Sequence, residues 1–323
     1  MATPQEPLPS VDRGLRRPLR VGIFLPTLSG IPPGATLGWR EHLALAQAAE
    51  AVGCDAIWVC DELHYWYPDA PPMGWWECWT FLSAIAAATE RAGVGTLVSC
   101  TNYRNPALLA KMATTVDEIS GGRLTLGLGS GWSEYQFRTF GFPTDHAVGR
   151  FEESLQVIRA LLREGRVSFD GQYYQAQDAT LLPAGPRPGR IPIMVGGTGP
   201  RVLGLAARYA DAWNVFLAGG DCSPGQALPH VAALEAACAA AGRDPATIRR
   251  SASVIVALSD EPLLLGTRDW TVGALRGSAI ELADQLRAFA DEGFDEVQVC
   301  ISPPTTGAIE QFGRVLEELE SGA

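Results

Sequence analysis

The sequence predicts a (β/α)8 barrel, a closed ring of eight parallel strands with helices between them. Short apolar runs alternate along the chain with stretches whose apolar residues recur every three or four positions, the spacing of one helix face. The runs are apolar throughout, as expected of parallel strands covered on both faces. A doubly wound open sheet is the structural alternative, but no Gly-x-Gly-x-x-Gly motif follows any strand.

Eight runs are predicted strands, and helices are predicted between them. The strands cover residues 20–26, 56–60, 94–100, 123–129, 191–196, 212–216, 253–258 and 296–301. The clearest helical patterns cover residues 39–53, 74–90, 106–120, 148–165 and 281–293. Several of these helices end in glycine, which suits a helix C-cap. A chain of 323 residues is long for one domain but usual for a barrel.

The rest of the chain is divided between one extension and two insertions. We expect a flexible, Pro-rich N-terminal extension at residues 1–18 and a single barrel domain at residues 19–323. Residues 167–176 predict a hairpin outside the barrel, with its tight turn at Asp170-Gly171. Residues 61–74 predict a long loop after the second strand, of the kind that forms a lid or a binding loop.

Composition argues against several classes of function. The formal net charge of −11 argues against a nucleic-acid partner, which needs clustered Lys and Arg. No uncharged apolar stretch of about 18 residues occurs, so we expect no membrane span. Seven cysteines without a Cys-x-x-Cys pair indicate a reducing cytoplasm. The four histidines lack metal-ligand spacing, so we expect no metal.

A Gly-rich turn follows the fifth predicted strand and opens a helix. Gly196, Gly197 and Gly199 lack side chains that would hold a ligand away from the backbone. Pro200 suits the first helical position, where a missing N–H costs nothing. The free amides of the first turn and the helix dipole favour a phosphate on Gly197 and Thr198. The alternative is an ordinary strand-to-helix turn.

Polar residues follow the second strand, where barrel enzymes carry catalytic groups. Asp61 and Glu62 are paired carboxylates that act as acid and base, or that only accept hydrogen bonds from loop amides and a ligand ring. His64 is a candidate proton donor or an ordinary loop histidine.

The ends of the third and fourth strands are also candidate ligand sites. Ser99, Cys100 and Thr101 end the third strand, where small polar side chains suit a planar polar ligand. Three glycines in residues 127–131 thin the end of the fourth strand, so that something flat can approach the backbone. Tight barrel packing is the alternative reason for those glycines.

Three segments of the chain resemble one known family. Residues 120–143, SGGRLTLGLGSGWSEYQFRTFGFP, closely resemble the luciferase-like monooxygenase superfamily. Residues 195–214, VGGTGPRVLGLAARYADAWN, are similar to the phosphate loop of that family, and residues 103–122 resemble its segment between the two strands before that loop. The resemblance extends from Val21 to Leu319.

The resemblance implies a barrel that binds a reduced flavin, either FMN or the deazaflavin coenzyme F420, at the strand ends. In the family the phosphate lies on the turn that matches residues 196–199. The ring lies near the positions of Ser99 and Cys100, where the family often has a cis peptide between non-proline residues. Positions that match Asp61, Glu134 and Tyr135 also touch the cofactor in relatives.

The resemblance also leaves the catalytic group open. Many deazaflavin-dependent relatives carry Asp-His after the second strand, with the histidine as a catalytic acid, whereas this chain has Asp61-Glu62. Glu62, His64 and Glu134 are the candidates for catalysis.

We therefore expect a cytoplasmic oxidoreductase that transfers a hydride between F420 and an apolar or aromatic small molecule. One alternative is a two-component FMN monooxygenase supplied by a separate flavin reductase. A second alternative is a non-catalytic flavin-binding homologue. The resemblance also implies a homodimer.

Overall fold

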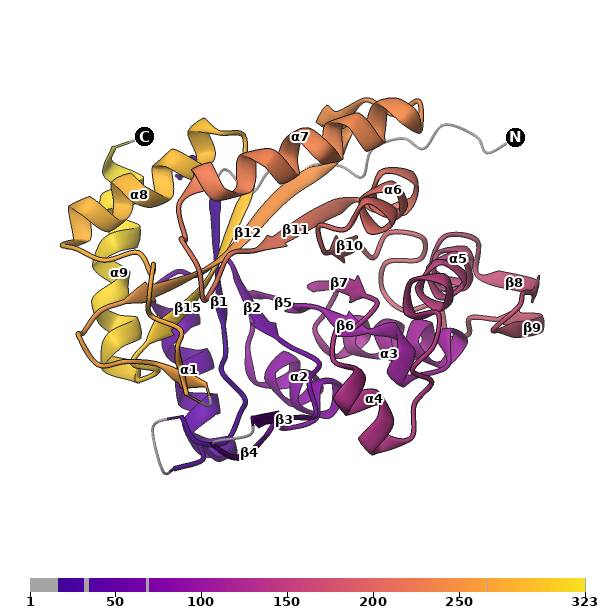
Figure 1. The fold of residues 1–323 in the computed structure, drawn as a ribbon, viewed down its shortest axis with the longest axis horizontal. Helices are drawn as coiled ribbons and strands as arrows, with labels where there is room; N and C mark the ends of the chain where they lie inside the picture. The colour runs from indigo at the N-terminus through magenta and orange to yellow at the C-terminus, as the bar shows by residue number, and fades with distance from the viewer. Residues whose placement is uncertain (1–16, 32–34, 68–69, 266, 323) are drawn as a thin grey trace.

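A computed structural model describes residues 17–31, 35–67, 70–265 and 267–322. Eight parallel strands form a closed barrel in this part of the chain, because β10 pairs with β7 and β15 pairs with β1 (Figure 1). The barrel strands are β1 (Arg20–Phe24), β2 (Ala56–Val59), β5 (Gly93–Thr96), β7 (Leu124–Gly129), β10 (Ile193–Gly196), β11 (Ala212–Phe216), β12 (Arg249–Ala257) and β15 (Glu296–Ser302). The predicted barrel is confirmed.

Helices surround the barrel, with α1, α8 and α9 on one side and α3, α5 and α6 on the other (Figure 1). The α-helices are α1 (Trp39–Ala51), α2 (Cys78–Ala88), α3 (Pro106–Ile119), α4 (Glu134–Phe140), α5 (Ala147–Glu164), α6 (Pro200–Tyr209), α7 (Pro224–Ala240), α8 (Ala279–Asp291) and α9 (Thr306–Ser321). Short 3-10 turns occur at η1 (Thr101–Tyr103) and η2 (Pro245–Thr247). No helix of the described residues is long and apolar enough to cross a bilayer.

Two barrel strands differ from the prediction. The third is interrupted, since a cis peptide between Leu97 and Val98 separates β5 from β6 (Ser99–Cys100), and both parts pair with β7. The expected run at 253–258 begins earlier, at Arg249, because the small residues Ser251 and Ser253 fit inside the barrel without an apolar pattern.

The predicted insertions are both antiparallel ribbons. Residues 61–74 are not an irregular loop, since β3 (His64–Tyr67) pairs with β4 (Ala70–Gly74). The second hairpin is longer than expected, β8 (Arg166–Asp170) with β9 (Gln175–Thr180), and a four-residue turn at 171–174 joins its strands. The Glu153 carboxylate accepts hydrogen bonds from three amides of that turn, which holds its shape without a tight two-residue connection.

The described chain starts just inside the expected N-terminal extension. Arg17 is buried, and its guanidinium donates to the Gly53 carbonyl at 2.7 Å and to the Asp55 carboxylate at 3.1 Å. Arg17 therefore packs against the barrel, although the expected boundary places it in the extension. The rest of the predicted extension, residues 1–16, lies outside the described residues.

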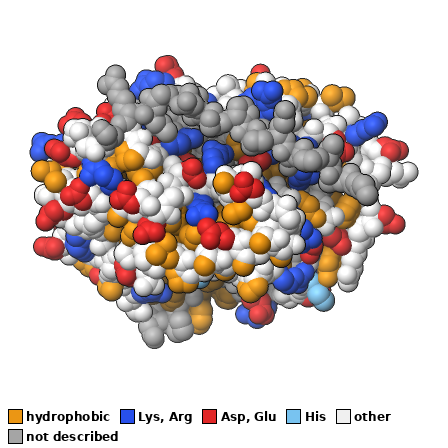
Figure 2. Space-filling model, turned by 90° about the horizontal axis from the view of Figure 1, so that it is seen from above, with side chains coloured by type: hydrophobic (Ala, Val, Ile, Leu, Met, Phe, Trp, Pro, Cys, Tyr) orange, Lys and Arg blue, Asp and Glu red, His pale blue; other side chains and the backbone are white. Residues whose placement is uncertain are grey.

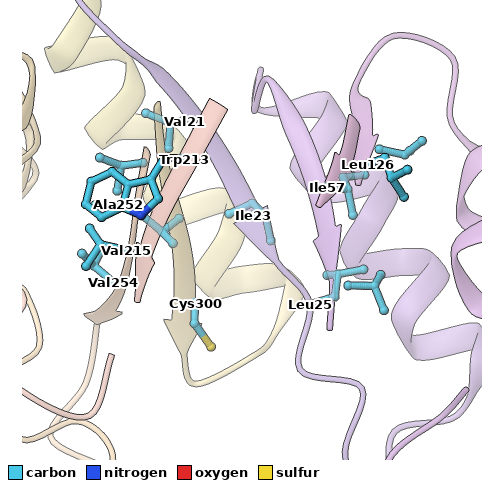
Figure 3. Close-up of a cluster of buried hydrophobic side chains, with 14 of the residues drawn as sticks. Val21, Ile23, Leu25, Ile57, Leu126, Trp213, Val215, Ala252, Val254 and Cys300 are labelled. Carbon is cyan, nitrogen blue, oxygen red and sulfur yellow. The ribbon is translucent and has the colours of Figure 1, made fainter. Parts of the chain in front are cut away.

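Two hydrophobic clusters make up the core. The larger one lies between the outer faces of the barrel strands and the helices, and includes Val21, Ile23 and Ile57 (Figure 3). The smaller one contains Trp58, Leu97 and other interior residues of the barrel strands. On the face shown in Figure 2, acidic and basic side chains are interspersed with apolar ones.

Glycines on neighbouring strands make room for Trp58 inside the barrel. A Cβ atom on Gly95 would lie 2.3 Å from the Trp58 ring, and one on Gly22 would lie 2.5 Å from its indole nitrogen. The indole N–H donates to Glu296 at 2.9 Å, so its one polar atom is paired. Trp58 thus occupies the space inside the barrel that side chains at Gly22 and Gly95 would otherwise fill.

We expect Gly95→Ala to lower the free energy of unfolding by about 1–3 kcal/mol, the usual cost of overpacking. Gly204, inside α6, is the matched control because a Cβ there meets nothing within 4 Å. Gly204→Ala should raise stability by up to about 1 kcal/mol. Urea denaturation of both variants tests this, and equal stability of the Gly95→Ala variant and the wild type would contradict it.

Candidate functional site

A cavity of about 770 Å3 opens at the carboxyl ends of the barrel strands. Its walls are mainly apolar and aromatic, and include Phe24, Trp75 and Phe216. Polar residues from β2, from the β10–α6 turn and from β15 reach it at separate points. A volume of this size suits a drug-sized ligand or a cofactor ring together with a small substrate.

The Gly-rich turn forms one wall of the cavity. Gly196, Gly197, Thr198 and Gly199 all line it, and α6 begins at Pro200 as predicted. Gly197 has φ +130°, a conformation that favours glycine, and its amide donates to the Asn214 carbonyl at 3.2 Å. Within the described residues, the amides of Thr198 and Gly199 meet no protein acceptor. They are free to bind an anion at the helix N-terminus.

Asp61 holds the end of the third strand. Its buried carboxylate accepts hydrogen bonds from the Ser99 hydroxyl at 2.9 Å and from the Cys100 amide at 3.0 Å. Arg104 donates to both carboxylate oxygens, at 2.5 and 3.0 Å. Burial raises the pKa of Asp61, and the Arg104 guanidinium opposes that shift. Asp61 lines the cavity, but four hydrogen bonds, two of them from the Arg104 guanidinium, hold its carboxylate in a structural ion pair.

Ser99 and Thr101 support the strand end from behind. Ser99 is fully buried, and its hydroxyl accepts a hydrogen bond from the Trp79 indole at 3.0 Å. Thr101 is also buried and donates to the Gly129 carbonyl at 3.2 Å. Neither side chain lines the cavity, whereas Cys100 does. Burial raises the pKa of the Cys100 thiol, so it is protonated near neutral pH.

Glu62 is the carboxyl group of the cavity that is open to chemistry. The Trp132 indole donates to one of its oxygens at 2.8 Å, and the Gln136 amide donates to the other. Burial raises its pKa from 4.5 to about 7, although those two hydrogen bonds lower it. A carboxyl group with this pKa exchanges a proton near neutral pH.

His64, Glu134 and Tyr135 do not line the cavity. His64 lies on β3 and packs against Tyr135 and Phe140, with ring centroids 5.0 and 5.2 Å away. Glu134 is exposed at the start of α4 and faces Arg138 at 3.8 Å. Tyr135 stacks on Trp66 at 5.8 Å. His64 and Tyr135 therefore pack between the ribbon and α4, and Glu134 lies on the surface.

Two glycines at the strand ends, Gly129 and Gly196, lie close to the side chain of Val98. A Cβ on Gly129 would lie 2.8 Å from Val98, and one on Gly196 would lie 2.9 Å from it. Val98 follows the cis peptide, which lies just before Ser99 and Cys100, and its side chain lines the cavity. Close packing against Val98 therefore accounts for Gly129 and Gly196, and both glycines also line the cavity.

The structure adds polar residues that sequence reasoning missed. Asn214, Ser253 and Gln298 line the floor of the cavity, and Arg268 lines its wall. The available signal was a lone polar residue within an apolar strand, as in AWNVF and EVQVC. That signal was weak, because the inward direction of these side chains depends on strand register.

We expect Arg104→Met to destabilise the fold by about 3–5 kcal/mol, because it leaves the buried Asp61 carboxylate without its cation. Adding Asp61→Asn should recover much of this loss, since the neutral amide needs no counter-charge. A double-mutant cycle by chemical denaturation measures the coupling. Additive effects of the two substitutions would show that the ion pair contributes nothing.

We expect Glu62→Gln to stabilise the protein increasingly as pH rises from 4.5 to about 7. Over this range the unfolded carboxyl ionises while the folded one stays protonated, so wild-type stability falls relative to the variant. Above pH 7 the difference should level off at about 3 kcal/mol. Denaturation of both proteins at several pH values tests this, and a constant difference would contradict the raised pKa.

Comparisons with known proteins agree with the barrel fold. Residues 19–263 match the family model described as luciferase-like monooxygenase. An F420-dependent glucose-6-phosphate dehydrogenase from Kineococcus radiotolerans is 31% identical over 76% of this chain and 74% of its own length. The pyrimidine monooxygenase RutA from Allorhizobium ampelinum is 30% identical over 70% of this chain and 64% of its own.

A solved structure has the same fold. An F420-dependent secondary alcohol dehydrogenase, solved with an F420-acetone adduct, superposes with a TM-score of 0.77 over 93% of this chain and 99% of its own, at 20% identity. The matched family model covers the first strand, the GSGW strand end and the Gly-rich turn alike. The chain belongs to the luciferase-like monooxygenase family, as the motifs predicted.

Proposed function

We propose that this protein is an oxidoreductase that uses the deazaflavin F420 and acts on an apolar or aromatic small molecule. The observation that carries the proposal is a single cavity that joins a Gly-rich anion turn to an apolar chamber, where the Glu62 carboxyl group has no ion-pair partner among the described residues. Relatives named as F420-dependent enzymes support the choice of cofactor.

The residues present fit a phosphate-bearing cofactor. The unpaired amides of Thr198 and Gly199 and the N-terminus of α6 would hold the phosphate. A Cβ on Gly199 would meet nothing within 4 Å, so the turn leaves space above it. The apolar wall that includes Val98 would hold the ring, and the cofactor would supply a hydride.

The protein's own part in the reaction is binding, exclusion of water and proton transfer. Aromatic side chains such as Trp75 and Trp270 close the chamber and lower its polarity. Glu62 would give a proton to the substrate oxygen, or take one from it, through a carboxyl oxygen. It takes the place of the family's histidine, and His64 is left out of this role because it does not line the cavity.

Two other functions lead to different measurements. The similarity to RutA, a monooxygenase, favours the alternative function of a two-component FMN monooxygenase. In that function a separate flavin reductase supplies the reduced cofactor. The third possible function is that of a non-catalytic flavin-binding homologue, which predicts a bound cofactor that neither a substrate nor oxygen reoxidises.

We also propose a cytoplasmic homodimer. The seven cysteines are free and buried, as suits a reducing compartment, and the dimer is inferred from the family. Light scattering of the purified protein tests the dimer.

Titration with each cofactor separates these functions. F420 and FMN are added separately to the purified protein, and the absorbance and fluorescence of each are followed. We expect a micromolar dissociation constant for F420 and much weaker binding of FMN. The reverse order would overturn the deazaflavin and favour the two-component monooxygenase.

We expect Gly199→Asp to weaken cofactor binding at least tenfold without loss of stability. Gly199 is the N-cap of α6, with extended backbone and no side-chain cap, and Asp is a preferred N-cap. The new carboxylate would compete for the helix amides and repel the phosphate.

Gly199→Asn is the matched control, because it caps the same amides without a charge. It should weaken binding less than Gly199→Asp. Gly197 is a poorer site for the test, since a side chain at φ +130° strains the backbone. Equal affinity of wild type and the Gly199→Asp variant for F420 would remove the turn from the site.

A further inference from the structure

The floor of the cavity is a small polar cluster inside an apolar barrel. Asn214, Ser253 and Gln298 come from β11, β12 and β15, which are neighbours in the sheet. Their side chains are almost wholly buried, with exposed fractions of 3%, 2% and 0%. Buried polar groups of this kind nearly always have hydrogen-bond partners, so each atom must be accounted for.

The hydrogen bonds determine which way the Asn214 amide points. The Ser251 hydroxyl has one hydrogen, and its other contacts, the Trp213 carbonyl at 3.2 Å and the Met194 sulfur at 3.5 Å, can only accept it. Towards Asn214, at 3.0 Å, Ser251 therefore acts as the acceptor. The Asn214 atom at that position is the donor Nδ2.

The same reasoning then determines the orientation of Gln298. Nδ2 of Asn214 also lies 3.1 Å from the Ser253 hydroxyl and 2.9 Å from the Gln298 amide. Two amino groups would repel each other at that distance, so the Gln298 atom there is the acceptor Oε1. The Ser253 hydroxyl lies 3.3 Å from the same oxygen. The side-chain oxygen of Gln298 thus accepts hydrogen bonds from within the protein.

The amino group of the Gln298 side chain does not take part in this hydrogen-bond network. Its Nε2 atom is buried and has no hydrogen-bond partner among the described residues. A buried donor without a partner costs free energy comparable to a lost hydrogen bond, and Gln298 borders the cavity. An acceptor bound in the cavity that Gln298 borders would supply the missing partner.

We propose that Nε2 of Gln298 is a binding site for a neutral carbonyl oxygen at the cavity floor. The cluster carries no charge, and two carboxyl groups, Asp61 and Glu62, line the cavity against one cation, Arg268, so a neutral acceptor fits better than a carboxylate. The carbonyl belongs to the dione ring of the cofactor or to a ketone substrate. The first source rests on the proposed function, and the second does not.

Gln298→Met tests the proposal, because it keeps the size of the side chain and removes the donor. Ser251→Ala is the control, since Ser251 touches the same Asn214 but does not line the cavity. F420 is titrated into wild type and both variants. Acetophenone and ethylbenzene, which differ by the carbonyl, are then titrated by calorimetry.

Loss of about three- to tenfold in F420 affinity in the Gln298→Met variant alone would assign the carbonyl to the cofactor; tenfold is the upper end of what one neutral hydrogen bond contributes. Unchanged F420 affinity together with a lost preference for acetophenone over ethylbenzene would assign it to the substrate. If the wild type binds neither F420 nor FMN, the proposed function fails, and the acetophenone result alone decides the role of Gln298.

A crystal structure of the wild type with F420 and acetophenone gives a second readout that needs no variant. We expect a carbonyl oxygen within about 3 Å of Nε2. Only a water molecule on Nε2, or a Gln298→Met variant that binds every probe as the wild type does, would overturn the proposal.

Discussion

The narrow interior of the barrel is the constraint on which the rest of the structure depends. An eight-stranded barrel encloses space for side chains only, so whatever fills it decides where a ligand can lie. Trp58 fills one level of that space because Gly22 and Gly95 have no side chains there. Val98 fills another level, beside Gly129 and Gly196. The cavity therefore occupies the remaining interior at the carboxyl ends of the strands.

The two carboxyl groups after β2 have different environments and so different roles. Asp61 is saturated by Arg104, Ser99 and Cys100, which makes it a support for the strand end. Glu62 faces the cavity and has neutral donors only, so burial raises its pKa to about 7. Two consecutive residues thus have different roles: Asp61 is a structural carboxylate and Glu62 is a candidate acid.

Much of the fold was predictable from local patterns, and less of the site was. The strand, turn and helix at 193–209 follow from an apolar run, glycines and Pro200, which act over a few residues. The ribbon at 64–74 was predicted as a loop, since HYWYPDAPPMG carries three prolines and no clear alternation. His64 and Glu134 have suitable chemistry near the strand ends, yet the direction of their side chains takes them outside the cavity.

The sequence by itself determined the barrel, the position of the Gly-rich turn and the family, because periodicity, turn residues and motifs are local. Only the tertiary structure decided which side chains share the cavity. Asn214 and Gln298 are 84 positions apart, and their amides lie 2.9 Å apart because β11 and β15 both pair with β12. Strand register and the space left by absent side chains determine such contacts, and neither is visible in a local pattern.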